Sequence, residues 1–320
     1  MKSPKTRFEP LVGGVVLGLL AVLLGSVPAE AGPLRHGMWV YGVAARAAGK
    51  CPPLTTSLLD DDPEAIDLVG FCERNQIAEL YLALGPRAIA LSDSRLPNFI
   101  AGLKGSGRHV EAIVGCTRVD DCRTGTWRTR IEQVKAYNDR SETNERFDGI
   151  HLDLEPWIGT CPPPPRKCDF SWVPDLIGYY RDASAALEGT GLTLAADISG
   201  VKVISDRIEP ADRQALLDAA TRLVLMEYEE RSVGTIHERV NTFIKAVDLS
   251  RASFMVATRV QDFGLNNDCQ NGTVLRQFDE LYGPTLGYAG WVTYKYSDIS
   301  DCNHYNDSSI CPDDCCVVGR

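Results

Sequence analysis

Residues 147–157 of this chain carry three ionisable side chains at a spacing that could support acid–base chemistry. In the run Phe-Asp-Gly-Ile-His-Leu-Asp-Leu-Glu-Pro-Trp, apolar and ionisable residues alternate with the period of a β-strand, so His151, Asp153 and Glu155 share one face. Pro156 ends the strand because it cannot donate a ladder hydrogen bond. A polar strand end without chemistry is the alternative, but three ionisable groups on one face cost desolvation energy. We therefore expect a site here.

Glu155, at the end of this strand, is suited to the role of general acid. A carboxyl group that is partly shielded from water beside Trp157 would have a raised pKa. Asp153 lies two residues deeper on the same face, close enough to share a proton or a hydrogen bond with Glu155 or with a substrate group. For His151, which lies deeper still, we favour a buried, hydrogen-bonded imidazole over a catalytic role.

Other strand-like segments end in residues that could join the same site. Residues 222–228 end with Tyr228, which could donate a hydrogen bond to a developing charge, and one of the flanking acids Glu227 and Glu229 could reach the site. Trp291 offers a flat apolar face on which a sugar ring could stack, with ordinary packing in the protein interior as the alternative. Two weaker candidates lie at the ends of further strands: Asp197 and Arg259.

Strand-like and helix-like segments alternate along most of the chain, about 30 to 45 residues apart, which is typical of β-α units. The expected strands are 37–43, 77–84, 109–116, 147–155, 192–198, 222–228, 253–259 and 286–294. The expected helices are 62–75, 95–103, 129–137, 173–187, 211–222, 233–247 and 274–281. An open doubly wound sheet usually stops at about five to seven strands, so we predict an α/β fold of the (β/α)8 TIM-barrel type. In such a barrel the active site lies at the C-terminal ends of the strands.

The two ends of the chain differ in composition from the middle. Basic residues precede an apolar run over 11–24, and small residues follow at 28–31, as in an export signal. An uncleaved membrane anchor is the alternative, although the run is short for a bilayer span. We expect a signal peptide over 1–31, a barrel domain over 32–296, and a cysteine-rich tail over 297–320 in place of an eighth helix.

All eleven cysteines lie beyond the signal-like start, which is typical of a protein exported to an oxidising compartment. Three pairs are close enough in sequence to staple local structure: Cys116 with Cys122, Cys161 with Cys168, and Cys51 with Cys72. The pairing of the tail cysteines stays open, and the odd total leaves at least one thiol free or paired between chains. A net charge of −10 repels nucleic acid and anionic lipid. We expect a secreted or periplasmic protein with no nucleic-acid partner and no membrane attachment after signal cleavage.

The segment from Asp148 to Glu155 resembles a family signature. Its sequence, Asp-Gly-Ile-His-Leu-Asp-Leu-Glu, is similar to the Asp-Gly-x-Asp-x-Asp-x-Glu motif of the chitinase-like family-18 glycoside hydrolases, with His151 in place of the middle acid. Met-Glu-Tyr-Glu at 226–229 is similar to the Met-x-Tyr-Asp of that family. Gly-Tyr-Ala-Gly-Trp at 287–291 is similar to the segment whose Trp closes the floor of the family's site.

The resemblance implies a substrate-assisted hydrolysis with retention of configuration, an exception to the scheme of two carboxylates. Glu155 would be the acid, Asp153 and Tyr228 would orient and stabilise a 2-acetamido group of the substrate, and Glu229 would be a further contact. His151 departs from the motif, because the acid that it replaces interacts in that family with the Asp corresponding to Asp153. The proton arrangement would therefore differ, or activity would be lost. The expected substrate contacts are Trp291, Trp157, Glu229, Asp197 and Arg259.

Three functions are compatible with these residues. The leading hypothesis is a secreted glycoside hydrolase that acts on glycans containing N-acetylhexosamine, with a carbohydrate as its partner and no cofactor or metal. A carbohydrate-binding protein on an inactive hydrolase barrel is the first alternative, favoured by His151. The second is a metal-dependent hydrolase that uses His151, Asp153 and Glu155 as ligands, although no other His is clearly placed at a strand end. The sugar, the linkage and the oligomeric state stay open.

Overall fold

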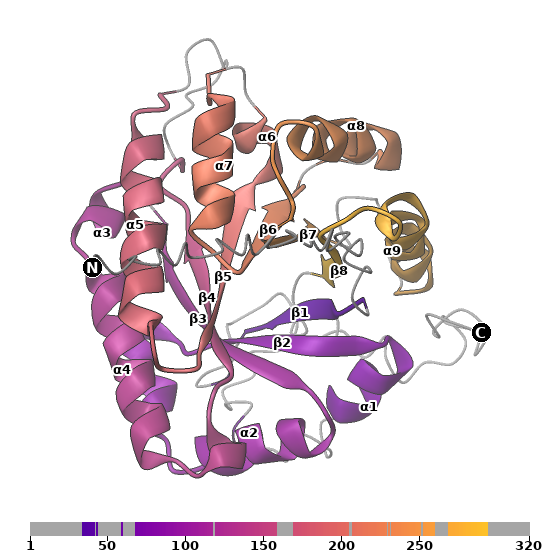
Figure 1. Cartoon of the computed structure of the whole chain (residues 1–320). Coiled ribbons are helices and arrows are strands. Elements are labelled where there is room, and N and C mark those ends of the chain that lie inside the picture. Colours follow the sequence, from indigo (N-terminus) through magenta and orange to yellow (C-terminus); the bar gives the residue numbers. More distant parts are fainter. Residues whose placement is uncertain are drawn as a thin grey trace, which may run out of the picture. The chain divides into compact units, whose positions relative to one another are not determined.

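The computed structural model describes residues 34–41, 43, 59, 68–117, 119–158, 169–204, 207–228, 230, 232–250, 252–259 and 268–293. Within these ranges, parallel strands close into an eight-stranded barrel in the sequential order β1 to β8. Helices lie around the outside of the strands (Figure 1). The predicted (β/α)8 barrel is thereby confirmed.

Each strand overlaps the segment that its hydrophobic pattern predicts. The strands are β1 His36–Val40, β2 Ile77–Ala83, β3 His109–Cys116, β4 Gly149–Leu154, β5 Thr193–Ser199, β6 Arg222–Met226, β7 Ser253–Thr258 and β8 Tyr288–Thr293. Most of their residues are buried, because barrel strands are covered by helices on one face and by opposite strands on the other.

The boundaries of the helices match the predicted segments less closely than those of the strands do. They are α1 Leu68–Arg74, α2 Leu96–Gly105, α3 Val119–Arg123, α4 Thr126–Arg140, α5 Trp172–Leu187, α6 Gly200–Val203, α7 Pro210–Asp218, α8 Val233–Ile244 and α9 Asp268–Tyr282, with 3₁₀ helices η2 Pro86–Ser92 and η3 Thr143–Glu145. The short elements α3, α6, η2 and η3 were not expected, since they are too brief to show an apolar period. The helix expected over 211–222 ends at Asp218, because Arg222 already belongs to β6.

Helix α8 illustrates how sequence and burial correspond. The Ser232 hydroxyl accepts a hydrogen bond from the backbone N–H of Thr235 and caps the helix. Ile236, Val240 and Phe243 are fully buried on the face toward the barrel. Burying each such side chain stabilises the fold by about 1.5 to 3 kcal/mol. The helix is therefore held mainly by its apolar stripe, as its sequence period predicts.

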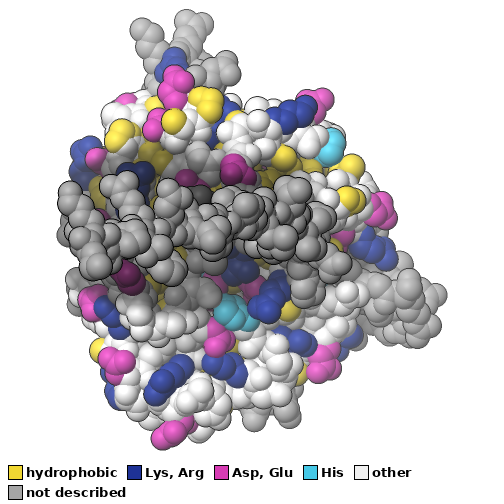
Figure 2. Space-filling view, viewed as in Figure 1, with side chains coloured by type: hydrophobic (Ala, Val, Ile, Leu, Met, Phe, Trp, Pro, Cys, Tyr) yellow, Lys and Arg dark blue, Asp and Glu magenta, His cyan; other side chains and the backbone are white. Residues whose placement is uncertain are grey.

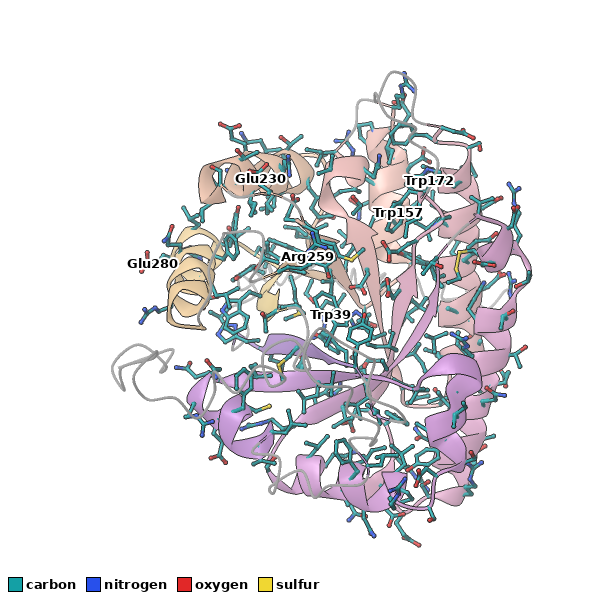
Figure 3. All side chains as sticks on the ribbon, turned by 180° about the vertical axis from the view of Figure 1, so that it is seen from behind. Trp39, Trp157, Trp172, Glu230, Arg259 and Glu280 are labelled. Carbon is teal, nitrogen blue, oxygen red and sulfur yellow. A yellow bond between two sulfur atoms is a disulfide. The ribbon has the colours of Figure 1, made fainter. Side chains whose placement is uncertain are left out.

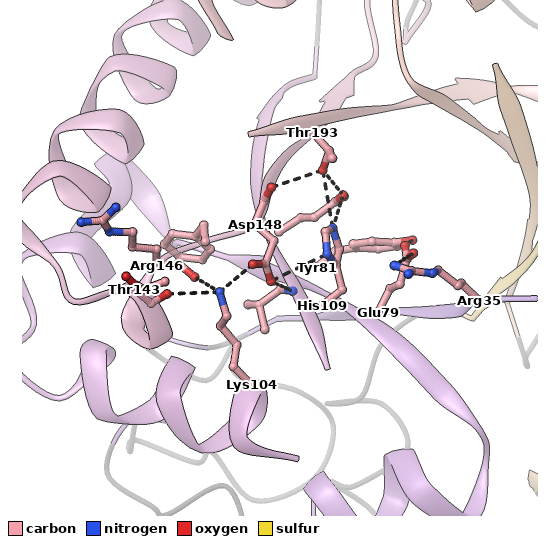
Figure 4. Close-up of polar contacts among 12 residues, drawn as sticks. Arg35, Glu79, Tyr81, Lys104, His109, Thr143, Arg146, Asp148 and Thr193 are labelled. Atoms are coloured by element: carbon pink, nitrogen blue, oxygen red, sulfur yellow. Dashed lines mark hydrogen bonds and ion pairs between the residues drawn. The ribbon is translucent and has the colours of Figure 1, made fainter. Parts of the chain in front are cut away.

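A buried ionic network closes the N-terminal end of the barrel. The Arg222 guanidinium donates to Glu79 Oε1 at 2.7 Å and to Glu111 Oε1 at 3.0 Å, and both carboxylates are fully buried. His109 and Thr193 also bond Glu111 (Figure 4). Burial alone would raise the pKa of Glu111, but the charge of Arg222 and the hydrogen bonds from His109 and His151 together outweigh it and hold this pKa well below its ordinary range. The charges of these residues are therefore satisfied by one another.

The cysteines bear out one of the three expected pairs. Cys116 and Cys122 form a disulfide between the end of β3 and α3, as predicted. The expected pair of Cys51 and Cys72 is wrong, because Cys72 has a free thiol that is buried on α1 and whose pKa burial raises to about 12. Three other predicted features lie outside the described residues: the signal peptide 1–31, the pair Cys161 and Cys168, and the tail 297–320. In the part of the chain that the structure describes, no helix has the length and apolar character to cross a bilayer.

Candidate active site

The predicted alternation along β4 is present in the barrel. His151 and Asp153 lie on the inner face, Glu155 follows directly after the strand, and the three apolar residues Ile150, Leu152 and Leu154 are fully buried on the outer face. Gly115 of β3 lies opposite Asp153 in the register, where an added Cβ would come within 2.8 Å of the Asp153 carbonyl oxygen. A larger residue would push the two strands apart. The absence of a side chain at Gly115 therefore lets the backbone of Asp153 pack closely against β3.

His151 forms the deepest layer of the site. Its Nε2 lies 2.8 Å from Asp197 Oδ1, and its Nδ1 lies 3.4 Å from Glu111 Oε2. Burial alone would lower the pKa of His151, but the charge of Asp197 and the hydrogen bonds to both carboxylates raise it to about 9. The ring is therefore an imidazolium that donates both of its protons, which agrees with the buried, hydrogen-bonded imidazole favoured from the sequence.

This arrangement bears on the metal hypothesis. An imidazolium with both N–H groups bonded to carboxylates has no lone pair to offer to a cation. Among the described residues, no group of three or more His, Cys, Asp or Glu side chains is arranged to hold a metal ion. His151, Asp153 and Glu155 accordingly share a face of β4 without converging on one point as ligands.

Asp153 and Glu155 form the acidic pair above His151. The Oδ1 atom of Asp153 is buried and has no hydrogen-bond partner among the described residues. Burial, followed by the charges of Asp197 and Glu155, raises the pKa of Asp153 well above its ordinary value. Burial and then the charge of Asp197 raise the pKa of Glu155 to about 7, against an opposing hydrogen bond from the Trp157 side chain. The shift favours the neutral form of Asp153, and Glu155, with its pKa of about 7, is poised to exchange a proton near neutral pH.

The acidic pair opens into a cavity of about 510 Å³ at the C-terminal ends of the strands, which we call the mouth cavity. Its aromatic lining is Trp39, Tyr41, Trp157 and Tyr228, and its ionisable lining is Asp153, Glu155, Asp197, Lys202 and Arg259. Figure 3 shows Trp39, Trp157 and Arg259 around the middle of the barrel, on different parts of the chain. A pocket with aromatic walls and a few ionisable groups is typical of a small-molecule or sugar site.

Tyr228 joins this cavity from the turn after β6. Its ring meets Trp39 edge-on at a centroid distance of 6.2 Å, and the Arg259 guanidinium lies 4.9 Å from the centroid of the Tyr228 ring. The structure thus brings Tyr228, Trp157, Asp197 and Arg259 together with Glu155, as expected from their positions at strand ends.

Trp291 does not line the mouth cavity. It is 1% exposed and stacks on His36 at a centroid distance of 4.1 Å, and His36 in turn contacts Asp279 of α9 at 3.4 Å. Trp291 therefore packs between the barrel wall and α9. The reason is a bulge in β8: Phe254 pairs with Tyr288 but Met255 pairs with Gly290, so one residue is inserted and every later side chain changes face.

The two acids that flank Tyr228 do not add to the described site. Glu227 is 1% exposed and accepts a hydrogen bond at 3.1 Å from Arg239 of α8, on the outer side of the barrel wall. Burial raises the pKa of Glu227 to about 7, although Arg239 opposes this. Glu229 lies outside the described residues. Glu227 is thus a structural carboxylate, and the expected contact by Glu229 stays a prediction.

The sequence did not single out several residues that line the mouth cavity. Trp39 comes from β1 and forms edge contacts with His151 and Tyr228, which places it at the floor of the cavity. Every residue of β1 is buried, so its pattern does not reveal which face is inward. Lys202 comes from α6, which is only four residues long. One sequence feature could have indicated Trp39: it lies in a predicted strand of the same barrel whose other strands end in the polar residues of the site.

The visible surface carries mixed charge. Figure 2 shows Lys and Arg side chains interspersed with Asp and Glu on the face of the molecule in view.

The fold is similar to that of several solved proteins. A family-18 chitinase from Pseudoalteromonas aurantia matches with a TM-score of 0.50 and 11% identity, over 84% of this chain and 96% of that chain. The C-terminal domain of a Desulfitobacterium hafniense protein assigned as a chitinase matches with a TM-score of 0.56 and 11% identity, over 86% and 96%. The spore cortex-lytic enzyme SleL of Bacillus megaterium matches with a TM-score of 0.52 and 10% identity, over 84% and 72%. No family model and no curated protein matches the sequence. At these identities the similarity is one of fold.

Proposed function

We propose that this chain is a glycoside hydrolase that cleaves glycans containing β-linked N-acetylhexosamine, with Glu155 as the general acid. The observation that carries the proposal is a carboxyl group with a pKa of about 7, half-buried in the mouth cavity beside Asp153 and Tyr228. A proton donor of this kind suits catalysis near neutral pH. The similarity of the barrel to those of chitinases supports the choice of a carbohydrate substrate.

In the first step, the Glu155 carboxyl group gives its proton to the glycosidic oxygen. The bond from C1 to that oxygen breaks, and its electron pair leaves with the departing sugar. The carbonyl oxygen of the 2-acetamido group then bonds to C1 and forms a cyclic intermediate. The Oδ1 atom of Asp153, which has no partner among the described residues, can accept a hydrogen bond from the amide N–H of that group, and the Tyr228 hydroxyl can donate one to its oxygen.

In the second step, the Glu155 carboxylate takes a proton from water. The water oxygen attacks C1 from the face that the leaving sugar vacated, and the cyclic intermediate opens. Two displacements at C1 give retention of configuration, with Glu155 acting first as acid and then as base. No second carboxylate is needed as a nucleophile, so Asp153 stabilises the acetamido group instead.

The walls of the mouth cavity suit a sugar. Trp39, Tyr41 and Trp157 present aromatic faces or edges on which the apolar side of a pyranose ring can pack. At the rim, Ile158 is 42% and Val201 43% exposed, which leaves apolar surface for a neighbouring sugar of a polymer.

We also propose that the protein is exported, with residues 1–31 removed as a signal peptide, residues 32–296 forming the barrel domain and residues 297–320 a disulfide-braced tail. The basic and apolar start of the sequence supports this, as does the disulfide between Cys116 and Cys122. A secreted or periplasmic location would give the protein access to glycan polymers outside the cytoplasm.

One observation favours a second candidate, a carbohydrate-binding protein on an inactive barrel. His151 directs its Nε2 to Asp197 and its Nδ1 to Glu111, and Asp153 Oδ1 is left without a partner among the described residues. In the family-18 motif an acid at the position of His151 interacts with the counterpart of Asp153. A barrel without that contact could bind the glycan and leave it intact.

The test is hydrolysis of fluorogenic N-acetylglucosaminides and chitin fragments by the purified mature protein, with and without a chelator. Glu155→Gln keeps the shape of the side chain but removes the titrating proton, so turnover should fall by about 10² to 10⁴ while sugar binding persists. Glu132→Gln is the matched control, because Glu132 is a solvent-exposed residue of α4. Turnover that is equal in wild type and Glu155→Gln would refute the proposal, and turnover abolished by the chelator would favour the metal-dependent alternative.

A further inference from the structure

A second cavity, of about 490 Å³, adjoins the mouth cavity at the C-terminal ends of β2 and β3, and we call it the side cavity. Asp153 lines both cavities, so the two meet at this side chain. The other residues of the side cavity that matter here are Gly115, Asp121, Thr126 and Arg130. A polymer bound across the acidic pair would therefore place one sugar in the mouth cavity and the next in the side cavity.

Arg130 of α4 carries a guanidinium that the described part of the protein leaves largely unused. Its Nη1 donates to the Gly115 carbonyl oxygen at 3.2 Å, and its Nε is buried without a hydrogen-bond partner among the described residues. Two arginines nearby in sequence are instead paired: Arg123 with Asp175, and Arg128 with Asp182. A buried donor without a partner costs about 1 to 3 kcal/mol. Because Nε is shielded from solvent while Arg130 as a whole is only partly buried and lines the cavity, a ligand there would meet the guanidinium through its terminal nitrogens.

The described lining of the side cavity contains a single basic residue, Arg130, together with Asp121 and Asp153. Burial and acidic neighbours raise the pKa of Asp153 well above its ordinary value, which favours its neutral form and so weakens its repulsion of an anion. Asp121 is exposed at the rim, where solvent and salt screen its charge. Arg130 is thus the cation that the cavity offers to its occupant.

The rim of the side cavity is braced. The disulfide between Cys116 and Cys122 ties the end of β3 to α3, and the hydroxyls of Thr124 and Thr126 bond each other at 2.8 Å. The backbone N–H of Arg128 donates to the Gly125 carbonyl at the start of α4. A rim held in this way keeps the guanidinium of Arg130 in one position relative to Asp153, which lowers the entropy cost of binding.

Resting on the function proposed above, we propose that the side cavity is a subsite for a sugar that bears a carboxylate, which Arg130 binds while Asp153 contacts the neighbouring sugar. A guanidinium matches a carboxylate in charge and in planar geometry, and such hydrogen bonds are stronger than neutral ones. The carboxylate can belong to a hexuronic acid or to a lactyl ether on an N-acetylhexosamine. Both sources present the same group to Arg130.

The test measures binding by calorimetry in the Glu155→Gln background, where turnover does not interfere. The probes are chitotetraose, a hyaluronan tetrasaccharide, and a tetrasaccharide that alternates N-acetylglucosamine with N-acetylmuramic acid. We expect at least one acidic probe to bind about tenfold more tightly than chitotetraose, since charge-assisted hydrogen bonds are worth that much or more. The acidic probe that binds more tightly identifies the source of the carboxylate.

Adding Arg130→Gln should reduce this ratio of affinities by about tenfold, and Arg130→Lys should retain part of it because the charge is kept. Lys135→Gln is the matched control, since Lys135 is on the same helix and pairs with Glu132 at the surface; it should keep the ratio. Equal affinity for all three probes, or a ratio that Arg130→Gln leaves unchanged, would overturn the inference. If Arg130→Lys loses the ratio of affinities as fully as Arg130→Gln does and also lowers Tm, Arg130 has a structural role. That result would overturn the inference too. Preference for an acidic probe together with no hydrolysis by wild type would refute the proposed function alone.

Discussion

The pKa of Glu155 predicts a specific pH dependence of kcat/KM. With a pKa of about 7, half of the Glu155 side chains hold the catalytic proton at pH 7. At the ordinary value of 4.5, only about 0.3% would do so, hence burial and the charge of Asp197 increase the active fraction about 150-fold. Activity that needs the protonated acid is present below the pKa and is lost above it. We therefore expect kcat/KM to fall about tenfold for each pH unit above 7.

Two substitutions should move this fall in kcat/KM above pH 7, which we call the alkaline limb, in opposite directions. Trp157→Phe keeps an aromatic ring but removes the hydrogen bond that stabilises the Glu155 carboxylate, so the pKa should rise. A hydrogen bond to a charged group is worth about 1.5 kcal/mol or more, which corresponds to a shift of about one pH unit upward. Asp197→Asn removes a negative charge that disfavours ionisation of Glu155, so the limb should move to lower pH.

The assay is the pH profile of kcat/KM on a fluorogenic N-acetylglucosaminide from about pH 4 to pH 10. Trp172→Phe is the control, because Trp172 packs edge-on against Trp157 at a centroid distance of 5.4 Å and its ring is buried away from the mouth cavity. Its profile should match that of wild type. Shifts of both test variants in the same direction, or no shift in either, would show that the environment of Glu155 does not set the limb.

Three further outcomes are expected. Asp153→Asn should lower kcat by about 10² on substrates with a 2-acetamido group and by much less on substrates with a 2-hydroxyl group, as measured by parallel kinetics; equal losses on both would contradict its proposed contact. Arg222→Met should reduce the free energy of unfolding by about 3 to 5 kcal/mol in urea titrations, because Glu79 and Glu111 would be left buried without their cation. Gly149→Ala should lower Tm, because an added Cβ would lie 2.2 Å from Thr193 Oγ1. The control is Gly178→Ala on α5, where nothing lies within 4 Å of the added atom; it should leave Tm unchanged or raise it.

The alternation of residues in β4 was sufficient to predict the central part of the site. A strand has a period of two, so once β4 forms, His151, Asp153 and Glu155 must share a face, whatever surrounds them. The same local periods predicted all eight strands and the barrel, because each unit buries its own apolar face. Cys116 and Cys122 are six positions apart, and their disulfide too follows from local reach.

Tertiary structure decided which groups meet those residues. The pairing of His151 with Asp197 and Glu111 joins three strands and depends on barrel closure, which no single segment encodes. The register of β7 and β8 inserts one residue before Gly290, and this turns Trp291 outward to His36, while Trp39 of β1 reaches the floor of the mouth cavity instead. A sequence shows the period of a strand, but a bulge is a property of two paired strands. The face that each Trp presents was therefore determined only when the strands paired.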